Sequence, residues 1–477
     1  MTQRPRHVVV IGNGMVGARF AEEVARRDPL GERIRVTVVG AEPEPAYNRV
    51  LLPKLLSGAL DPSDILLPAA DGPAVAVRTG VAATAFDPAD RHVTLDDGAT
   101  LHYDELVLAT GSRAALPPVD GLTAAGGGPA PGVSTLRDLA DCRRVLDHVR
   151  PGAPVAVLGG GLLGLEAARA LDARGARVTV VEPAPRLMPR QLDDAAGEIL
   201  AAALRRFGVG AITGRTAARW EPGQGLWLDD GRVVIASGVV VAAGVRPATE
   251  LAVAAGLAVD RGVVVDDTLA TSAPGVYAIG DCAQHPDGGA GLVQPGWDQA
   301  RVLADLLTGA GPHARYRGGT VVTRLKADGV ELTSLGEVNA DAETLTLSDP
   351  HGRRYAKLSV RSERVVGAIL LGFPDAAATI TQLYDLAAPV PTDRIALLLG
   401  RALPEPAAGA ATAGPALVCR CNGVTREQLS DAWRNGARTR EALAKSTRAT
   451  TGCGGCVRDV NALLAAWDDT APVSVAG

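Results

Sequence analysis

Apolar residues recur as short, nearly continuous runs through the first two thirds of the chain, and glycine bounds most of these runs. Seven of them are HVVVIG, IRVTVVG, DELVLATG, PVAVLGGG, RVTVVE, GVVVAAG and GVYAIGD. Strands that are buried on both faces of a parallel sheet have this continuous pattern rather than a strict alternation. Stretches with helical spacing, such as GLEAARALDARG (164–175), lie between the runs. The pattern predicts an α/β fold with doubly wound, Rossmann-like sheets.

The pattern changes in the region 316–401. The runs TVVTRLKADGVELTSLGEV, ETLTLSD, RYAKLSV and RVVGAILLGF are separated by turn residues. They predict antiparallel strands followed by helices, and therefore a smaller α+β unit. The next segment, RALPEPAAGAATAGPA (401–416), is rich in Pro, Ala and Gly and has no apolar period. We interpret it as a linker that leads to a compact tail.

Composition and charge narrow the classes of partner. Aromatic residues make up only 3% of the 477 residues, so the cores must consist mostly of Ala, Val and Leu. The net charge of -5 argues against a general nucleic-acid binder, which needs a basic patch. The N-terminus MTQRPRHVVVIGNG lacks the features of a signal peptide. No run approaches the ~20 apolar residues of a membrane span. We therefore expect a cytoplasmic protein with neither nucleic-acid nor membrane partners.

A glycine motif follows the first predicted strand. Gly12, Gly14 and Gly17 form G-x-G-x-x-G at the start of a helix. The first glycine allows a tight turn, the second lets a pyrophosphate approach the backbone, and the third allows close packing of helix and strand. A second strand ends just before Glu42, whose carboxylate can accept hydrogen bonds from a ribose diol. This context predicts a dinucleotide site, whereas the motif alone would fit a generic βα turn.

The same motif occurs a second time. Gly159, Gly161 and Gly164 repeat the spacing, and the strand ARVTVVE ends at Glu182. Two complete motifs predict two dinucleotides, and the alternative is a duplicated fold with an inactive second site. Glu182 would repel a 2′-phosphate, which favours NADH over NADPH. Arg186 and Arg190 lie nearby in the sequence and moderate that preference, so NADPH stays possible.

Two further stretches place a glycine after a buried strand, LVLATGS (106–112) and GVYAIGDCA (275–283). Asp281 could hold sugar or ribitol hydroxyls. Taken alone, each stretch fits a simple turn equally well. The two stretches add four candidate cofactor-binding residues: Thr110, Gly111, Gly280 and Asp281.

The order of these motifs, together with GVRP and GDCA, resembles the two-dinucleotide flavoprotein reductases. The stretches AYNRVLLPKLLSG and RLMPRQLD narrow this resemblance to the N-terminal half of NADH-dependent assimilatory nitrite reductases and to related nitrate reductase electron-transfer subunits. The resemblance covers nearly the whole chain. It implies FAD in the first domain and a nicotinamide nucleotide in an inserted second domain. It also implies that FAD contacts Gly12, Gly14, Gly17, Glu42, Arg49, Lys54 and Asp281.

The same resemblance implies two catalytic residues, Lys54 and Glu166, which would form an ion pair beside the isoalloxazine. Lys54 near N5 could stabilise negative charge on the reduced flavin. The alternative for Glu166 is an acid in the first turn of a helix that the helix dipole favours.

The domain boundaries also follow from the resemblance. We expect an FAD-binding domain at 1–118 and 245–314, an NAD(P)H-binding domain at 119–244, an α+β domain at 315–400, a linker at 401–416, and a small helical domain at 417–468. The chain has no cysteine before Cys142, so it lacks the redox C-x4-C of glutathione-reductase-like relatives.

Four of the six cysteines lie in the tail. The spacing is Cys419-x-Cys421, then 31 residues, then Cys453-x2-Cys456. Four thiolates can bind a [2Fe–2S] cluster. The residues TREQ (425–428) form a capping box, and VRDVNALLAAW predicts a second helix, so that two helix N-termini would face the cluster.

Structural zinc and redox-active thiols remain alternatives for these cysteines. Zinc sites usually have two to four residues between paired cysteines, which fits C-x-C poorly. A redox-active thiol pair would need a lowered thiol pKa. The stretches CRCNGVT and TTGCGGC resemble the bacterioferritin-associated-ferredoxin type of [2Fe–2S] domain, which favours the cluster.

Together these features predict an NADH-dependent, FAD-containing oxidoreductase that relays single electrons through a [2Fe–2S] cluster. Relatives that reduce nitrite continue into sirohaem and [4Fe–4S] domains that need further cysteines, so we expect a separate catalytic partner. Assimilatory nitrate reductase is the first choice and a sirohaem nitrite reductase the second. Other hypotheses are a reductase for a ferredoxin or rubredoxin, and an iron-release partner of bacterioferritin.

Overall fold

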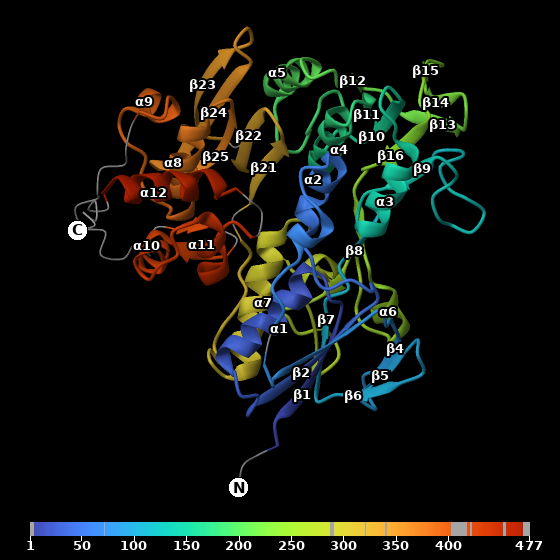
Figure 1. Ribbon diagram of the computed structural model, residues 1–477, viewed down its shortest axis with the longest axis vertical. Helices are drawn as coiled ribbons and strands as arrows, with labels where there is room; N and C mark the ends of the chain where they lie inside the picture. Colours follow the sequence, from blue (N-terminus) through green and yellow to red (C-terminus); the bar gives the residue numbers. More distant parts are fainter. Residues whose placement is uncertain are drawn as a thin grey trace, which may run out of the picture. The chain divides into compact units, whose positions relative to one another are not determined.

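The computed structural model forms two compact units (Figure 1). The first comprises Met1–Arg49, Pro62–Arg113 and Val245–Gly319, and the second comprises Val50–Asp61, Ala114–Gly244 and Thr320–Gly477. The structure describes residues 4–70, 72–286, 291–319, 321–338, 341–401, 417–419, 422–451 and 455–470.

A five-stranded parallel sheet organises the first unit, in the order β19-β7-β1-β2-β3. Helices α1 (Met15–Arg27) and α7 (Val293–Thr308) pack against each other and against this sheet through one buried apolar cluster that includes Val8, Phe20 and Leu303. The inner strands β7, β1 and β2 are mostly buried, as expected where both faces of a sheet are covered, whereas the edge strand β3 is largely exposed. Their bounds are β1 (Arg6–Ile11), β2 (Ile34–Gly40), β3 (Val75–Thr79), β7 (Glu105–Leu108) and β19 (Val276–Ala278).

Smaller elements complete the first unit. A three-stranded antiparallel sheet joins β3 to β7. It consists of β4 (Ala83–Asp87), β5 (His92–Leu95) and β6 (Thr100–His102). The chain passes from the first unit to the second at β8 and returns at β17, and these two short strands pair with each other. The bounds of the remaining elements are α6 (Glu250–Ala254), β8 (Ser112–Ala114), β17 (Val245–Pro247), β18 (Val263–Val264), β20 (Ala283–Gln284) and the 3-10 turns η2 (Pro62–Ile65) and η3 (Gly280–Cys282).

The second unit repeats this plan. Its parallel sheet has the order β12-β11-β10-β16-β9, and a three-stranded antiparallel sheet again lies in the chain between β12 and β16. Four strands of the two sheets correspond, β7-β1-β2-β3 and β16-β10-β11-β12, in agreement with the repeated glycine motif. The fifth strand differs, because β19 comes last in the first sheet whereas β9 comes first in the second. The bounds are β9 (Val133–Thr135), β10 (Pro154–Leu158), β11 (Arg177–Glu182), β12 (Gly210–Thr213), β13 (Ala217–Glu221), β14 (Gly225–Leu228), β15 (Val233–Val234) and β16 (Gly238–Val241).

Four helices pack around this second sheet or beside it. The short helix α2 contacts α3 and α4, although it precedes them by about a hundred residues. Residues 50–61, which contain α2, therefore group with the second unit, whereas the boundaries expected from the resemblance assign them to the first domain. The bounds are η1 (Arg49–Leu51), α2 (Leu52–Ser57), α3 (Leu139–His148), α4 (Leu162–Ala173) and α5 (Asp194–Arg205).

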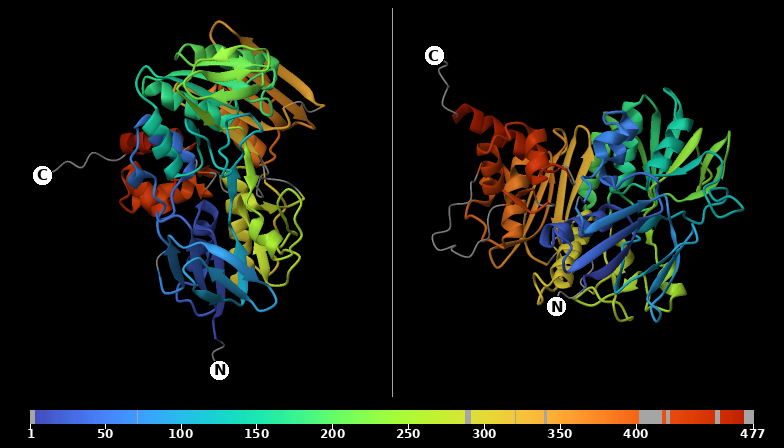
Figure 2. Two further views of the ribbon diagram at one scale, coloured as in Figure 1. Left: turned by 90° about the vertical axis from the view of Figure 1, so that its right-hand side faces the viewer. Right: turned by 60° about the horizontal axis from the view of Figure 1, so that its bottom comes forward.

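An α+β domain and a small helical domain complete the second unit. The α+β domain has a five-stranded antiparallel sheet in the order β21-β22-β25-β24-β23, and α8 packs on it. In the small domain, α10, α11 and α12 form a bundle, coloured red in Figures 1 and 2. The bounds are β21 (Val322–Ala327), β22 (Val330–Gly336), β23 (Glu343–Asp349), β24 (Arg354–Arg361), β25 (Arg364–Leu371), α8 (Pro374–Asp385), α9 (Arg394–Leu398), β26 (Leu417–Cys419), β27 (Val424–Thr425), α10 (Arg426–Arg434), α11 (Arg440–Thr447) and α12 (Val457–Thr470).

The α/β class, both Rossmann-like sheets and the α+β region are as the sequence predicts. The expected capping box is also confirmed, since the Thr425 side chain accepts from Gln428 N while the Gln428 side chain accepts from Thr425 N. The elements that were not anticipated include the antiparallel sheets β4–β6 and β13–β15 and the helix α11. The expected linker lies almost wholly outside the described residues.

Candidate functional site

The first glycine motif forms a tight turn between β1 and α1. Gly12 has φ of +119°, and a Cβ atom there would lie 2.2 Å from the carbonyl oxygen of Ala109. A Cβ atom on Gly17 would lie 1.9 Å from the carbonyl oxygen of Gly12. Gly14 differs, because it is the N-cap of α1 and nothing lies within 4 Å of its Cβ position. Two glycines thus serve packing, whereas the middle one leaves open space at a helix N-terminus, where a pyrophosphate fits.

The second motif repeats this geometry atom for atom. Gly159 has φ of +114° and approaches the carbonyl oxygen of Ala242, and a Cβ atom on Gly164 would lie 2.0 Å from the carbonyl oxygen of Gly159. Gly161 is the N-cap of α4 and has nothing within 4 Å of its Cβ position. Both turns can therefore accept an anionic diphosphate, and neither is closed by a side chain.

The acids after β2 and β11 are held differently. In the first unit, Glu42 pairs with the Arg49 guanidinium and accepts a hydrogen bond from the Tyr47 hydroxyl. In the second unit, Glu182 accepts from Gly160 N at 2.7 Å and from Ala184 N at 2.9 Å, and it is buried. Each carboxylate keeps acceptor capacity for a ribose diol, because an ionised carboxylate has about four lone-pair sites.

The stretches after β7 and β19 lie next to each other in the first unit. Thr110 Oγ1 donates to Ala248 O at 2.7 Å, and Gly111 has φ of +70°. Asp281 accepts a hydrogen bond from Ser112 Oγ at 2.7 Å, so the two stretches are joined directly. Gly280, with φ of +77°, donates its N–H to Gln299 on α7 at 2.7 Å. The four candidate residues therefore lie at the carboxyl end of this parallel sheet, where ligands bind in open α/β sheets.

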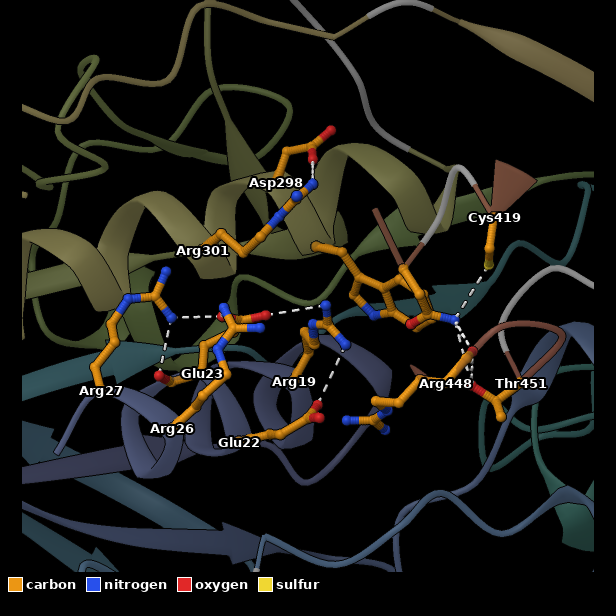
Figure 3. A network of polar contacts seen from close by, with 12 residues as sticks. Arg19, Glu22, Glu23, Arg26, Arg27, Asp298, Arg301, Cys419, Arg448 and Thr451 are labelled. Carbon is orange, nitrogen blue, oxygen red and sulfur yellow. Dashed lines mark hydrogen bonds and ion pairs between the residues drawn. The ribbon is translucent and has the colours of Figure 1, made fainter. Parts of the chain in front are cut away.

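Ion pairs along α1 fix the helix that opens at Gly14. Glu23 is almost fully buried; it forms an ion pair with Arg19 at 2.9 Å and accepts a hydrogen bond from Arg27 at 2.5 Å (Figure 3). Arg27 also pairs with Asp305 on α7 at 2.6 Å. A buried carboxylate that is paired on several sides holds its partners in one geometry, and this network therefore positions α1 against α7.

The two expected catalytic residues belong to a polar cluster in the second unit. Glu166 lies beyond the first turn of α4, so the alternative of a first-turn acid is wrong. The residue is buried, and its Oε1 accepts from the backbone N–H of Lys326 at 2.9 Å. Burial raises the pKa of Glu166, and the charges of Lys326 and Lys54, together with the Lys326 amide, only partly offset that rise. The Lys54 ammonium pairs with the Asp328 carboxylate. Lys54 and Glu166 are thus brought near enough to interact electrostatically, but the direct partner of Lys54 is Asp328.

Lys326 and Asp328 belong to the β21–β22 hairpin, and Arg169 of α4 forms hydrogen bonds to this hairpin. Arg169 donates to Asp328 O at 3.1 and 3.2 Å, and its guanidinium stacks over the Phe207 ring at 4.0 Å. Sequence analysis missed Arg169, Lys326 and Asp328. The turn itself carries a signal, because A-D-G-V between two apolar runs is typical of a tight hairpin. Nothing in the sequence relates that hairpin to α4.

Two of the four tail cysteines can be described. Cys419, at the end of β26, and Cys456, just before α12, are both buried. The Asn422 amide lies 3.6 Å from Cys419 Sγ and donates to Arg448 O at 2.6 Å; Figure 3 shows Cys419, Arg448 and Thr451 together. Asn422 therefore ties the loop after the first cysteine pair to the loop before the second. Cys421 and Cys453 lie outside the described residues.

The other two cysteines lie in apolar surroundings. Burial raises the pKa of Cys142 to about 12, and burial also raises the pKa of Cys282. Cys282 Sγ contacts the carbonyl oxygens of Leu108 and Ile279 at 3.4 and 3.3 Å. Both thiols stay protonated near neutral pH, as expected of small residues without a redox role.

Within the part of the chain that the structure describes, no helix combines the length and apolar character needed to cross a membrane.

Three family models match the chain. Residues 6–301 match "Pyridine nucleotide-disulphide oxidoreductase", residues 322–384 match "Rubredoxin NAD+ reductase C-terminal domain", and residues 417–466 match "BFD-like [2Fe-2S] binding domain". The first model covers well over half of the chain.

Individual relatives agree with these models. "Nitrite reductase [NAD(P)H]" of Bacillus subtilis (strain 168) is 34% identical over 96% of this chain and 57% of its own length. "Assimilatory nitrate reductase electron transfer subunit" of the same organism is 32% identical over 97% of this chain and 60% of its own length. The chain therefore spans a little over half the length of these two curated relatives.

A solved structure agrees on the fold. The covalent putidaredoxin reductase–putidaredoxin complex contains a chain with a TM-score of 0.72 and 24% identity, which covers 81% of this chain and 95% of its own length. The cofactors that the family models and these relatives support are FAD, a nicotinamide nucleotide and a [2Fe–2S] cluster. The chain belongs to the pyridine nucleotide-disulphide oxidoreductase family, as an NAD(P)H-dependent flavoprotein without the flavin-adjacent dithiol and with a C-terminal BFD-like [2Fe–2S] binding domain.

Proposed function

We propose that this chain takes electrons from NADH and delivers them singly to a separate catalytic subunit, an assimilatory nitrate reductase. The observation that carries the proposal is the combination in one chain of two glycine turns, each with an open middle glycine, and two buried cysteines at the arms of a BFD-like tail. When bound, FAD accepts an electron pair from the nicotinamide and the cluster passes electrons on one at a time.

The first unit supplies the FAD-holding residues in this proposal. The N-terminus of α1 at Gly14 would receive the pyrophosphate, and Glu42 would receive the adenosine ribose, with Arg49 beside it. Asp281, already oriented by Ser112, would accept hydroxyls of the ribitol. By the family resemblance, Lys54 would lie beside the flavin and stabilise negative charge on the reduced ring, while Glu166 would balance the charge of Lys54.

The second unit supplies the nicotinamide nucleotide site. Glu182 lies at the end of β11, where its carboxylate would accept the ribose hydroxyls and repel a 2′-phosphate. Of the two arginines nearby in the sequence, Arg186 is already bonded to Leu192 O at 2.8 Å and to Asp194 at 2.6 Å. These contacts support NADH as the preferred donor.

The choice of acceptor rests on the two Bacillus subtilis relatives. One is named as an electron transfer subunit of assimilatory nitrate reductase, and its similarity spans 97% of this chain. The other is named as a nitrite reductase, so a sirohaem nitrite reductase is the second candidate acceptor. An assimilatory role fed by NADH agrees with a cytoplasmic location, which we also propose.

The test is an anaerobic titration of the purified chain with NADH, followed by absorbance and EPR, with iron and sulfide assayed on the same sample. The proposal predicts bleaching of the flavin, an S = ½ signal from the reduced cluster, and equal amounts of iron and sulfide. Bleaching without that signal, in a protein that carries zinc or no metal in the tail, would exclude the relay.

A second experiment addresses the acceptor. The NADH-reduced chain is mixed with a catalytic nitrate reductase subunit plus nitrate, or with a sirohaem nitrite reductase plus nitrite, and reoxidation is followed optically. The proposal requires faster reoxidation with the nitrate reductase pair. Reoxidation by the nitrite reductase alone would replace the first acceptor with the second.

A further inference from the structure

Strand β21 forms two hydrogen bonds within the second unit, one to the expected catalytic residue Glu166 and one beside a cysteine of the BFD-like domain. The backbone N–H of Lys326 donates a hydrogen bond to the carboxylate of Glu166 at 2.9 Å. At residue 324, the Arg324 guanidinium donates to the carbonyl oxygen of Gly455 at 3.0 Å. Gly455 immediately precedes Cys456, a cysteine of the BFD-like domain. The Cα atoms of residues 324 and 326 lie about 7 Å apart along an extended strand.

A second set of contacts joins the same small domain to α8 and to the β21–β22 hairpin. Arg458, on the first turn of α12, pairs with Asp375 at 3.1 Å and reaches Glu331 at 3.8 Å. Glu331 lies directly opposite Lys326 in the β21–β22 ladder. The docking face is therefore defined by Arg324, Glu331 and Asp375 on the α+β domain, and by Gly455 and Arg458 on the BFD-like domain.

The absence of a side chain at Gly455 leaves room for the Arg324 guanidinium. A Cβ atom at Gly455 would lie 2.7 Å from the Arg324 guanidinium nitrogen, so a side chain there would displace the arginine. The positive charges of Arg324 and Arg458 also act on Asp459, where they partly offset the rise in pKa that burial causes. Arg324 thus meets both a carbonyl dipole and a nearby carboxylate of the BFD-like domain.

We propose that Arg324 is a positioning residue that docks the BFD-like domain on β21, so that electrons pass from the Glu166 side of this strand to the Cys456 side. The inference rests on the proposed function, because it assumes the flavin lies beside Lys54 and Glu166. The docking contact itself does not depend on that assumption. Electron transfer weakens steeply with distance, so a domain that leaves this face would receive electrons more slowly.

The experiment uses the full-length protein loaded with flavin and cluster, and compares Arg324→Gln and Arg324→Lys with wild type. The matched control is Arg361→Gln, on β24 of the same sheet, because Arg361 donates to Asp341 O at 2.9 Å on the α+β domain itself. Rapid mixing with NADH measures flavin bleaching optically and cluster reduction by freeze-quenched EPR. Hydrogen–deuterium exchange of segments 322–336 and 455–467 measures docking without any turnover.

We expect Arg324→Gln to leave the rate of flavin bleaching unchanged and to slow cluster reduction about tenfold, as loss of one charge-assisted hydrogen bond would. Exchange in both segments should rise before any NADH is added. Arg324→Lys, which keeps the positive charge that glutamine lacks, should restore part of each effect, and Arg361→Gln should show neither. Unchanged cluster reduction together with unchanged exchange in Arg324→Gln would overturn the proposal.

Two safeguards keep the outcome interpretable. If the cluster of the wild-type protein is not reduced by NADH, the proposed relay fails, but the exchange measurement still decides whether Arg324 docks the domain. If Arg324→Gln loses flavin or iron, Asp375→Asn serves instead, because it weakens the other end of the same face at an exposed position. That variant should change exchange and cluster reduction in the same direction, and the absence of both changes would refute the docking.

Discussion

The two kinds of glycine in each dinucleotide turn allow a sharp test of their separate roles. Gly14→Ala adds a methyl group where nothing lies within 4 Å, and Gly17→Ala adds one at 1.9 Å from the carbonyl oxygen of Gly12. The two positions lie three residues apart at the start of the same helix. The first substitution should therefore affect FAD binding with little effect on folding, and the second should affect folding itself.

The expected magnitudes follow from the backbone. Gly14 has φ of −82°, which alanine adopts freely, so restricting the unfolded chain stabilises the protein by about 0.4–1 kcal/mol. Alanine is a poorer helix N-cap than glycine by about 0.5–1 kcal/mol, so the net change is close to zero. For Gly17, overpacking against backbone costs about 3 kcal/mol, and improved helix propensity returns about 1 kcal/mol. We expect Gly17→Ala to destabilise the first unit by about 2 kcal/mol.

The assay must separate binding from stability. Native-state hydrogen exchange of the flavin-free protein, read at β1 and β2, reports the stability of the first sheet alone. FAD rebinding is measured separately by quenching of flavin fluorescence. Because each charge-assisted hydrogen bond to the pyrophosphate contributes about 1.5–3 kcal/mol, losing one should weaken FAD binding about tenfold to a hundredfold in Gly14→Ala.

Two results would refute this reasoning. Gly14→Ala could bind FAD as tightly as wild type, which would mean that the open space in front of this residue is not where the pyrophosphate lies. Alternatively, both variants could be destabilised by the same amount in the flavin-free protein. That result would mean that the two glycines do not have separate roles in packing and in binding.

Three further predictions concern the second unit. Gly161→Ala should raise KM for NADH about tenfold with unchanged flavin content, measured by steady-state kinetics. Burial alone would raise the pKa of Asp193, but hydrogen bonds from Tyr355, the Ala196 amide and Lys357 hold it below the ordinary value. Asp193→Asn should therefore lower unfolding free energy by about 1 kcal/mol at pH 7, a difference that shrinks as pH falls below about 4 in urea titrations. Thr425→Ala should cost α10 about 1 kcal/mol, seen as faster exchange over 426–434.

The elements that sequence analysis found are those whose signals are local. The strands β1, β2 and β10 are mostly apolar runs ended by glycine, and β11 is a similar run ended by Glu182. The capping box at Thr425 needs only four consecutive residues. The strands of the antiparallel insertions give weaker signals. β4 (ATAFD) and β6 (TLH) mix polar and apolar residues over very short lengths, so their period is hard to distinguish from that of a loop.

The candidate site divides in the same way. The glycines and the acids after β2 and β11 follow from spacing along the chain, and the open space at Gly14 and Gly161 fits that interpretation. The partners of Lys54 and Glu166 could not be found, because Asp328 and Lys326 lie 274 and 160 residues away in sequence. Asn422 is a similar case. Its position after Cys421 is visible in the sequence, but its hydrogen bond to Arg448 O depends on how the tail folds.

The first sheet is built from segments that are far apart in the sequence, and this separation determines the order in which the two parallel sheets can fold during synthesis of the chain. Leu106 of β7 pairs with Val276 of β19, and the whole Rossmann-like part of the second unit is made between them. On a ribosome, the first sheet must wait for its last strand, while the intervening parallel sheet β9–β16 has already emerged in full. Closing so long a loop costs less entropy once its interior has folded and its ends meet at the β8–β17 ladder. The first unit therefore begins to be made first and is completed last.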